Sequence, residues 1–163
     1  MSTTTRAGIG YDSHRFADGG PMRLGGIDIP WDRHCEGHSD GDAICHAVTD
    51  ALLGAAALGD IGEMFPDTDA VNKGKDSLVM LEAAVGRLQA SGWRPVNVDV
   101  TVITQMPKIG PYRAAMRAKL ARVLGLSEDE VFVKGKTNEG MGWIGRAEGL
   151  AVMAVATVVR RQA

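Results

Sequence analysis

Residues 39–58 read SDGDAICHAVTDALLGAAAL, and this stretch decides the fold because it is the clearest helix pattern in the chain. Its apolar side chains recur at helical spacing, at Ile44, Val48, Ala51, Leu52 and Ala55. Ser39 is a natural N-cap with Asp42 three residues later in a capping-box position, and Gly59 closes the last turn. The stretch therefore predicts a helix over residues 39–58 with one apolar stripe.

Outward from this helix, the flanking segments predict further strands and helices. The predicted strands are Arg6–His14, Met22–Leu24, Ile27–Ile29, Val96–Thr104, Val131–Lys134 and Leu150–Val159, and the further helices are Asp76–Ala90 and Pro111–Leu124. Gly25 and Gly26 predict a hairpin turn between the two shortest strands. The last strand is almost wholly apolar, so we expect it to be buried on both faces. This order predicts an α+β fold, a mixed β-sheet with helices packed on one face.

Composition and charge exclude several classes of protein. The 163 residues carry 18 Lys and Arg against 20 Asp and Glu, a net charge of −2, and 45% are hydrophobic. This length predicts a single domain over residues 1–163, and the balanced charge argues against a nucleic-acid partner. The longest apolar run, Leu150–Val159, is far below the roughly 18 residues of a membrane span, and we expect no signal peptide. Two cysteines without a disulfide framework, Cys35 and Cys45, indicate a cytoplasmic protein.

Histidines and carboxylates are concentrated in the first half of the chain. All four histidines precede residue 47, and residues 34–72 hold eight carboxylates without one Lys or Arg. Asp12 and His14 are two apart on a predicted strand, so both leave the same face, and His46 lies on the predicted helix. Two strand ligands and one helical histidine form a three-ligand set with an open fourth position, typical of catalytic zinc. A solvated acidic face and a hydrogen-bonded His14 at a strand end remain alternative interpretations.

A closed structural metal site is a competing interpretation of the same region. Cys35, His38, Cys45 and His46 have suitable residue types. However, Cys45 and His46 are adjacent on a helix and point about 100° apart, so they converge poorly on one ion. The cysteines fit better as small buried apolar residues.

Residues 134–146 form a polar, glycine-punctuated segment that suits phosphate oxygens. Its polar side chains include Lys136, Thr137, Asn138, Glu139 and Arg146, and Glu139 could hold a second, hard cation. An ordinary charged loop is the alternative. The N-terminus of the helix predicted from Ser39 adds free backbone N–H groups as an anion site beside the metal.

Several of these runs resemble the 2-C-methyl-D-erythritol 2,4-cyclodiphosphate synthases, the cyclases of the non-mevalonate isoprenoid pathway. The resemblance is carried, in order along the chain, by residues 10–16 (GYDSHRF), 38–42 (HSDGD) through His46, 49–54 (TDALLG), 59–62 (GDIG), 65–69 (FPDTD) and 145–149 (GRAEG). It implies conversion of 4-diphosphocytidyl-2-C-methyl-D-erythritol 2-phosphate to a cyclic diphosphate plus CMP. It also implies a homotrimer with active sites at subunit interfaces, each with one Zn²⁺ and one Mg²⁺ or Mn²⁺.

The resemblance also implies roles for individual residues. Asp12, His14 and His46 match the zinc ligands, Glu139 matches the ligand of the second metal, and His38 and Thr137 match the catalytic positions that stabilise the transition state. Substrate contacts are implied for Asp12, His14, His38, Ser39, Asp60, Ile61, Gly62, Phe65, Pro66, Asp67, Thr68, Asp69, Thr104, Gln105, Met106, Pro107, Lys108, Ile109, Gly110, Lys136, Thr137, Asn138, Glu139, Trp143 and Arg146. The loop from Thr104 to Gly110 would bind cytidine from the adjacent subunit, and Trp143 and Arg146 would lie near the trimer axis.

Two single positions and one short segment depart from the usual pattern of the family. Trp143 stands where phenylalanine is usual, Thr104 where alanine is usual, and residues 135–138 read GKTN instead of small residues and threonines.

Two other functions use the same ligands. One is a metal-dependent phosphohydrolase with water as its nucleophile, and the other is a non-catalytic, zinc-stabilised trimeric or interaction domain.

Overall fold

The computed structural model describes residues 2–161, and the predicted domain, 1–163, extends past them at both ends. Five strands form one mixed sheet in the order β4-β1-β7-β5-β6. They are β1 (Thr3–Asp18), β4 (Arg33–Cys35), β5 (Arg94–Ile103), β6 (Val131–Lys136) and β7 (Gly149–Arg161). β5 and β6 run parallel, and the other neighbours run antiparallel. β2 (Met22–Leu24) and β3 (Ile27–Ile29) form the predicted hairpin as a separate sheet, and Gly25 and Gly26 in its turn have positive φ.

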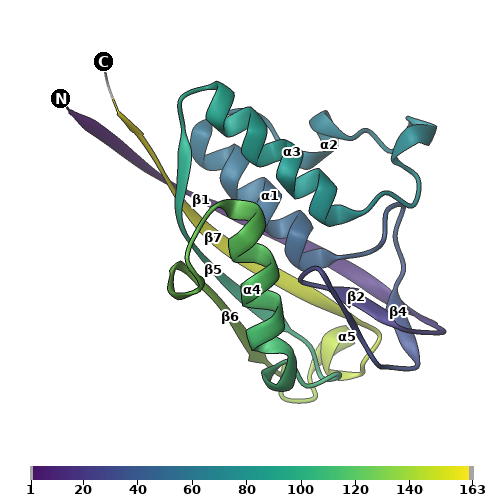
Figure 1. Ribbon diagram of the computed structural model, residues 1–163. Coiled ribbons are helices and arrows are strands. Elements are labelled where there is room, and N and C mark those ends of the chain that lie inside the picture. Colours follow the sequence, from purple (N-terminus) through teal and green to yellow (C-terminus); the bar gives the residue numbers. More distant parts are fainter. Residues whose placement is uncertain (1, 162–163) are drawn as a thin grey trace.

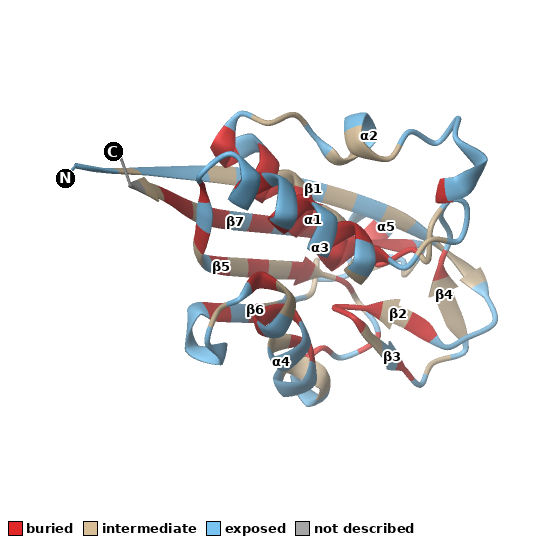
Figure 2. Cartoon of the chain, turned by 45° about the horizontal axis from the view of Figure 1, so that its top comes forward, coloured by how far each residue is buried: buried red, intermediate tan, exposed pale blue. Residues whose placement is uncertain are grey.

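Three long helices cover one face of the sheet, which confirms the predicted layer arrangement (Figure 1). These are α1 (Ala43–Ala56), α3 (Ser77–Ala90) and α4 (Arg113–Leu124). Two short helices, α2 (Ile61–Met64) and α5 (Gly142–Gly145), and 3₁₀ turns at Ala70–Asn72, Gly110–Tyr112 and Glu128–Glu130 complete the described chain. Buried residues, coloured red in Figure 2, gather where the helices meet the sheet. None of the helices in residues 2–161 combines the length and apolar character that a membrane span requires.

Helix α1 lies directly on β1 because β1 has glycines where the two backbones meet. A Cβ added to Gly8 would come within 2.9 Å of the Ala55 side chain and would overlap the Ala51 carbonyl oxygen. Small alanines recur along this side of α1 at positions 43, 47, 51 and 55, and all four are buried. The sequence of both elements therefore sets a short distance between the helix and the strand.

The start of α1 differs from the prediction. The N-cap is Asp42, whose carboxylate accepts from the Cys45 backbone N–H at 3.1 Å. The same carboxylate also accepts from the backbone N–H groups of Gly25 at 2.9 Å and Gly26 at 2.7 Å. Ser39 was the wrong N-cap because Asp42 satisfies both the helix terminus and the β2–β3 turn. The anion site predicted at the N-terminus of a Ser39 helix is therefore also misplaced.

The C-terminal strand is longer than predicted and is buried on one face only. Alternate residues face the helices, whereas Met153 is 41% exposed and Val155 is 45% exposed. They lie opposite Tyr11 and Ile9 of β1, which are 56% and 63% exposed. The prediction of burial on both faces is wrong within this chain, and an apolar patch of four residues covers the outer face of β1 and β7.

Most of the remaining boundaries are close to the predicted ones, but β1 begins three residues before and ends four residues after the predicted Arg6–His14. Helix α3 begins after Asp76, which caps it through the Leu78 N–H, and Gly125 ends α4 in the left-handed conformation. Pro111 lies in the 3₁₀ turn before α4 and not in its first turn. The short elements β4, α2 and α5 were not predicted, because three or four residues carry too little periodicity to be recognised.

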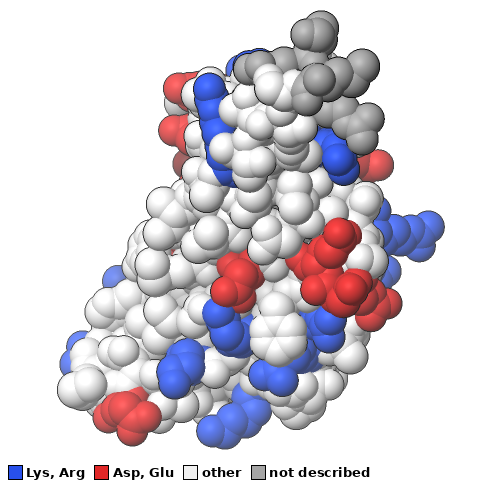
Figure 3. All heavy atoms as spheres, turned by 90° about the vertical axis from the view of Figure 1, so that its left-hand side faces the viewer, with Lys and Arg blue, Asp and Glu red and all other residues white. Residues whose placement is uncertain are grey.

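The free edge of β6 is closed by two arginines from α4. Arg113 Nε donates to the Val133 carbonyl at 2.7 Å, and Arg117 Nε donates to the Val131 carbonyl at 2.7 Å. Both guanidinium groups also lie over the Phe132 ring, at 5.2 and 5.3 Å from its centre. Figure 3 views this side of the molecule, and basic side chains gather over its lower half, where β6 and α4 lie. Capped carbonyls make the edge a poor template for another strand.

Candidate active site

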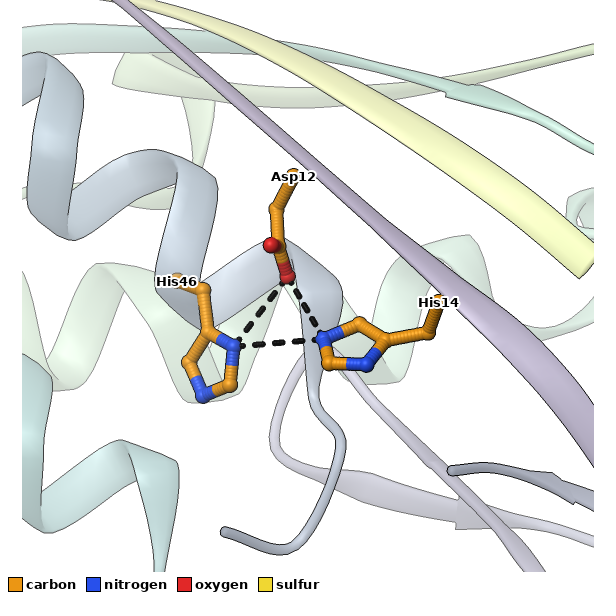
Figure 4. A group of neighbouring side chains, drawn as sticks. All are labelled: Asp12, His14 and His46. Carbon is orange, nitrogen blue, oxygen red and sulfur yellow. Dashed lines mark hydrogen bonds and ion pairs between the residues drawn. The ribbon is translucent and has the colours of Figure 1, made fainter. Parts of the chain in front are cut away.

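Asp12 and His14 of β1 and His46 of α1 converge on one point (Figure 4). Asp12 Oδ2 lies 2.7 Å from His14 Nε2 and 3.1 Å from His46 Nδ1. The two ring nitrogens are 3.4 Å apart. Among residues 2–161, this is the one group of three or more Asp, Glu, His and Cys side chains arranged to hold a metal. The structure thus brings together the three residues whose spacing predicted a metal site.

The donor set fits a tetrahedral ion with an open position. Zinc–ligand bonds of about 2.0–2.1 Å in a tetrahedron separate neighbouring ligand atoms by roughly 3.3–3.4 Å. The 3.4 Å between His14 Nε2 and His46 Nδ1 already matches this separation. The two carboxylate contacts are shorter and need only a small opening. Two imidazoles and one carboxylate are donors typical of zinc and related transition metals.

The charges of these three groups reinforce one another. Burial opposes ionisation of Asp12, but hydrogen bonds and charge from His14 and His46 outweigh it and lower the pKa of this carboxyl. Burial likewise disfavours the charged form of His14, but the hydrogen bond and charge of Asp12 outweigh it and raise the pKa of this imidazole. A cation at this point is therefore favoured, whether it is a proton or a metal ion.

Contacts behind the two histidines fix the direction of their rings. His14 Nδ1 donates to the Glu36 carbonyl oxygen at 2.7 Å, which leaves Nε2 as the nitrogen that faces Asp12. His46 Nε2 lies 3.0 Å from the Ser39 hydroxyl and 2.8 Å from the Ser77 hydroxyl. Each imidazole therefore presents one nitrogen to the common point and holds the other within the protein.

A pocket of about 250 Å³ opens over this group. Many of the predicted site residues line this pocket, namely Asp12, His14, His38, Ser39, His46, Ile61, Gly62, Phe65 and Asp67. Asn72 and Met80 line it as well and were not predicted. Asp60 and Asp69 were predicted as substrate contacts, but here their carboxylates cap α2 and the 3₁₀ turn at residues 70–72. They position the loops around the pocket.

A second pocket, of about 420 Å³, lies at the ends of β5 and β6. Its lining includes the predicted Thr104, Pro107, Lys108, Ile109, Gly110, Lys136 and Thr137, and also Arg113, which was not predicted. The two pockets share no lining residue. The first is lined by carboxylates and imidazoles, whereas the second has three basic side chains and no carboxylate. Their chemistry is complementary, since the second pocket suits an anion.

The chain matches the model of a known protein family. The model of the YgbB family matches residues 5–159. The chain belongs to the YgbB family.

Two relatives of this YgbB-family chain carry the same name. The chain is 79% identical over 159 residues to the 2-C-methyl-D-erythritol 2,4-cyclodiphosphate synthase of Gemmatimonas aurantiaca, covering 98% of this chain and 96% of the relative. It is 57% identical over 150 residues to the synthase of that name from Chromobacterium violaceum, covering 92% and 95% of the two chains. These matches fit the resemblance found in the sequence.

Solved structures of similar sequence have the same fold as this chain. A 2C-methyl-D-erythritol-2,4-cyclodiphosphate synthase with CDP bound superposes with a TM-score of 0.85 at 40% identity, covering 93% of this chain and 98% of that one. The bifunctional IspDF from Campylobacter jejuni superposes with a TM-score of 0.94 at 38% identity. That match covers 99% of this YgbB-family chain and 44% of the bifunctional one.

Asn138, Glu139 and several other predicted residues lie outside the two pockets. Thr137 donates to Glu139 at 3.1 Å, and Asn138 donates to the Met141 carbonyl at 2.8 Å, so this turn is held by its own side chains. Gln105, Met106, Pro66 and Thr68 belong to the predicted loops but do not line either pocket. Trp143 lines a shallow hollow beside His14, and Arg146 pairs with Glu148 at 3.1 Å on the exposed surface. Their roles remain predictions.

The competing closed metal site does not form. Cys35 and Cys45 are buried free thiols, and the Cys45 Sγ donates to Asp42 Oδ2 at 3.3 Å. Burial, followed by the charges of Asp42 and Asp12, raises the pKa of Cys35 to about 12. Burial and Asp42 likewise raise the pKa of Cys45. The interpretation of both cysteines as small buried residues is confirmed.

Ser77 is a further residue of this site that sequence reasoning missed. It is fully buried and contacts His46, although the two are 31 residues apart. A serine after Asp76 reads as part of a helix start, so only the folded chain reveals its contact with His46. Asn72 was missed as well, because nothing in the sequence marks its contact within the loop. Its side-chain amide donates to the Pro66 carbonyl at 3.0 Å.

Proposed function

We propose that this chain converts 4-diphosphocytidyl-2-C-methyl-D-erythritol 2-phosphate to 2-C-methyl-D-erythritol 2,4-cyclodiphosphate and CMP. The observation that carries the proposal is the open three-ligand set of Asp12, His14 and His46 in a chain 79% identical to a synthase of that name. The enzyme would be a phosphorus–oxygen lyase of isoprenoid precursor biosynthesis. Its buried free cysteines fit work in the reducing cytoplasm.

Asp12, His14 and His46 would hold one Zn²⁺, and Glu139 would contribute to binding Mg²⁺ or Mn²⁺ at the diphosphate. Bound divalent ions supply charge neutralisation and an aligned diphosphate. Imidazoles suit zinc, and a carboxylate beside phosphate oxygens suits the harder ion.

The chain needs no general base for this reaction. An oxygen of the 2-phosphate attacks the β-phosphorus, the bond from that phosphorus to the bridging oxygen breaks, and CMP leaves with the bridging oxygen. The nucleophile is already an anion, so no proton has to be removed from it. The difficulty is repulsion between two anions, which Lys108 and Lys136 would reduce by electrostatic stabilisation.

The remaining predicted residues would position the substrate. His38, Ser39 and Thr137 have hydrogen-bonding side chains that could stabilise charge in the transition state. The loops at Asp60–Gly62 and Phe65–Asp69 would enclose the methylerythritol phosphate, and the loop at Thr104–Gly110 would hold cytidine. Ring closure gains from proximity because both reacting groups belong to one molecule, provided that water is excluded.

The working form would be a homotrimer with composite active sites. Ile9, Tyr11, Met153 and Val155 form an exposed apolar patch that a second copy can bury. The metal pocket and the basic pocket share no lining residue, which fits a site completed by the basic pocket of a neighbouring subunit. Trp143 and Arg146 would then lie near the threefold axis.

Complementation between two inactive variants tests the composite site. His46→Ala removes a metal ligand, and Lys136→Ala removes a cation from the other pocket. Mixing these subunits after dissociation creates sites with both pockets intact, so activity should return to a measurable fraction of wild type. Mixed trimers that stay as inactive as either parent would contradict shared sites, and each variant reassembled alone is the control.

Product analysis tests the reaction itself. The protein, loaded with zinc and magnesium, is incubated with the cytidyl substrate and followed by phosphorus NMR. We expect equal amounts of cyclic diphosphate and CMP. An open-chain bisphosphate with CMP would assign a phosphohydrolase, and unchanged substrate on zinc-loaded protein would assign a binding domain.

A further inference from the structure

A chain of hydrogen bonds leads from His46 away from the metal point to a carboxylate that the proposed function does not use. His46 Nε2 lies 2.8 Å from Ser77 Oγ, and the Ser77 hydroxyl donates to Asp40 Oδ1. The Ser77 backbone N–H donates to Asp40 Oδ2 at 3.0 Å. Asp40 therefore holds Ser77 through both its hydroxyl and its amide.

Asp40 is itself held by several donors. The Asp42 backbone N–H donates to Asp40 Oδ1 at 3.1 Å, and Arg23 Nε lies 3.9 Å from Asp40 Oδ2. Arg23 is further tied to Asp28 at 3.3 Å and Asp76 at 3.7 Å. The Asp40 side chain is only 19% exposed. A carboxylate with this many donors is fixed in place and ready to orient the Ser77 hydroxyl.

The direction of this chain sets which nitrogen of His46 is free. A carboxylate accepts but does not donate, so the single Ser77 hydroxyl proton points to Asp40. The Ser77 oxygen then faces His46 with a lone pair and accepts a hydrogen bond from Nε2–H. The Nδ1 lone pair is left facing Asp12 and His14, which is the state that a metal ligand requires.

Ser77 is better suited to this task than Ser39, which also contacts His46. Ser77 is fully buried at the first residue of α3, whereas Ser39 is partly exposed on the loop before α1. The Ser39 hydroxyl is 3.0 Å from His46 Nε2. Of the two serine hydroxyls that contact His46, the one that also donates to a carboxylate among the described residues is that of Ser77. Ser39 remains available to the pocket that it lines.

We propose that Ser77 and Asp40 are positioning residues that hold His46 with Nδ1 toward the metal. This inference rests on the proposed metal centre. It adds a carboxylate–hydroxyl–imidazole connection between α3, the loop before α1 and α1 itself. Partners of this kind behind a metal ligand commonly contribute 10–100-fold to metal affinity or activity.

Zinc affinity of four variants tests the proposal, measured by competition with a chromophoric chelator. Ser77→Ala and Asp40→Asn should each bind zinc about 10–100-fold more weakly than wild type. Ser91→Ala is the matched control, because Ser91 is exposed at the far end of the same helix, and it should bind as wild type does. His46→Ala should lose the site. Circular dichroism of the metal-free variants checks that α3 still forms.

Proton NMR of the zinc-loaded protein supplies a readout besides affinity and activity. The His46 Nε2–H should give a downfield resonance that exchanges slowly with water, and Ser77→Ala should broaden or remove it. If Ser77→Ala binds zinc within twofold of wild type and keeps this resonance, the positioning role is wrong while the metal centre stands. Unchanged affinity in Asp40→Asn would remove Asp40 from the role. A wild-type protein that binds zinc no better than His46→Ala would overturn both the metal centre and this inference.

Discussion

Gly10 of β1 lies against Ala47 of α1 so closely that a Cβ on Gly10 would overlap the Ala47 carbonyl oxygen and come within 2.9 Å of the Ala51 nitrogen. Asp12 is two residues from Gly10, and His46 is next to Ala47. The same backbone contact therefore determines how near the helical ligand comes to the strand ligands. The geometry of the metal group therefore depends on glycine at position 10 as well as on the three ligands.

Gly10→Ala is expected to push α1 away from β1. We expect a loss of about 1–3 kcal/mol in the free energy of unfolding, typical of overpacking, together with weaker zinc binding. Gly54→Ala is a matched control on α1, since Gly54 is exposed with open space where its Cβ would lie, and it should stabilise by about 0.5–1 kcal/mol. Urea unfolding at one protein concentration measures both. Equal effects in the two variants would contradict the close packing.

Asp42→Ala is expected to be severely destabilising. The fully buried carboxylate accepts from Gly25, Gly26 and Cys45, and its removal leaves buried N–H groups unpaired at about 1–3 kcal/mol each. Asp76→Ala removes a partly exposed N-cap from α3 and should cost only about 1 kcal/mol. The unfolding midpoints compare the two. Similar losses would mean that Asp42 acts only as a helix cap.

His46→Ala is expected to lose zinc and activity while the oligomer survives. Zinc affinity should fall by more than about 100-fold, beyond the usual effect of losing an outer partner. His34→Ala is the control, because its Nδ1 contacts the Gly19 carbonyl at 2.6 Å, away from the metal group. Metal analysis and sedimentation measure zinc content and assembly. An active, zinc-free His46→Ala protein would rule out the proposed role of the site.

Zinc binding is expected to weaken as the pH falls. Burial opposes the charged form of His14, but hydrogen bonding to Asp12 and its charge outweigh burial and raise the pKa of His14 above its ordinary value near 6.5, so a proton competes with zinc for Nε2 at and below that raised pKa. Each unit of pH below the raised pKa should reduce the apparent affinity about tenfold for this proton, and affinity should level off above it. Titration calorimetry in buffers of different ionisation enthalpy measures the released proton. No proton release at pH 6 would contradict this linkage.

The sequence predicted the metal group because its signals are local. Asp12 and His14 are two apart on a strand, and His46 lies on an apolar helix, so periodicity alone placed each of them. Ser77 could not be found in this way, because its contact with His46 depends on how α3 packs beside α1. The N-cap was misassigned for a related reason. Asp42 was preferred over Ser39 because it also binds the distant turn at Gly25 and Gly26.

The outer face of the sheet shows another limit of sequence reasoning. Met153 and Val155 are apolar like their buried neighbours in β7, so composition could not separate the two faces. The alternation appears only when β7 is paired with β1 and covered by α1. The patch that they form with Ile9 and Tyr11 lies outside the core of this chain, and it is the surface that we propose a second copy buries.

Ring closure is the central claim, and phosphorus NMR of the reaction in ¹⁸O-labelled water tests it most directly. Attack by the 2-phosphate joins only oxygens of the substrate, so the cyclic diphosphate and CMP should both lack the isotope shift that ¹⁸O causes. We expect the cyclic product in unlabelled form from zinc-loaded wild-type protein and no product from His46→Ala. An ¹⁸O-labelled open-chain phosphate would mean that water is the nucleophile, and it would contradict the account.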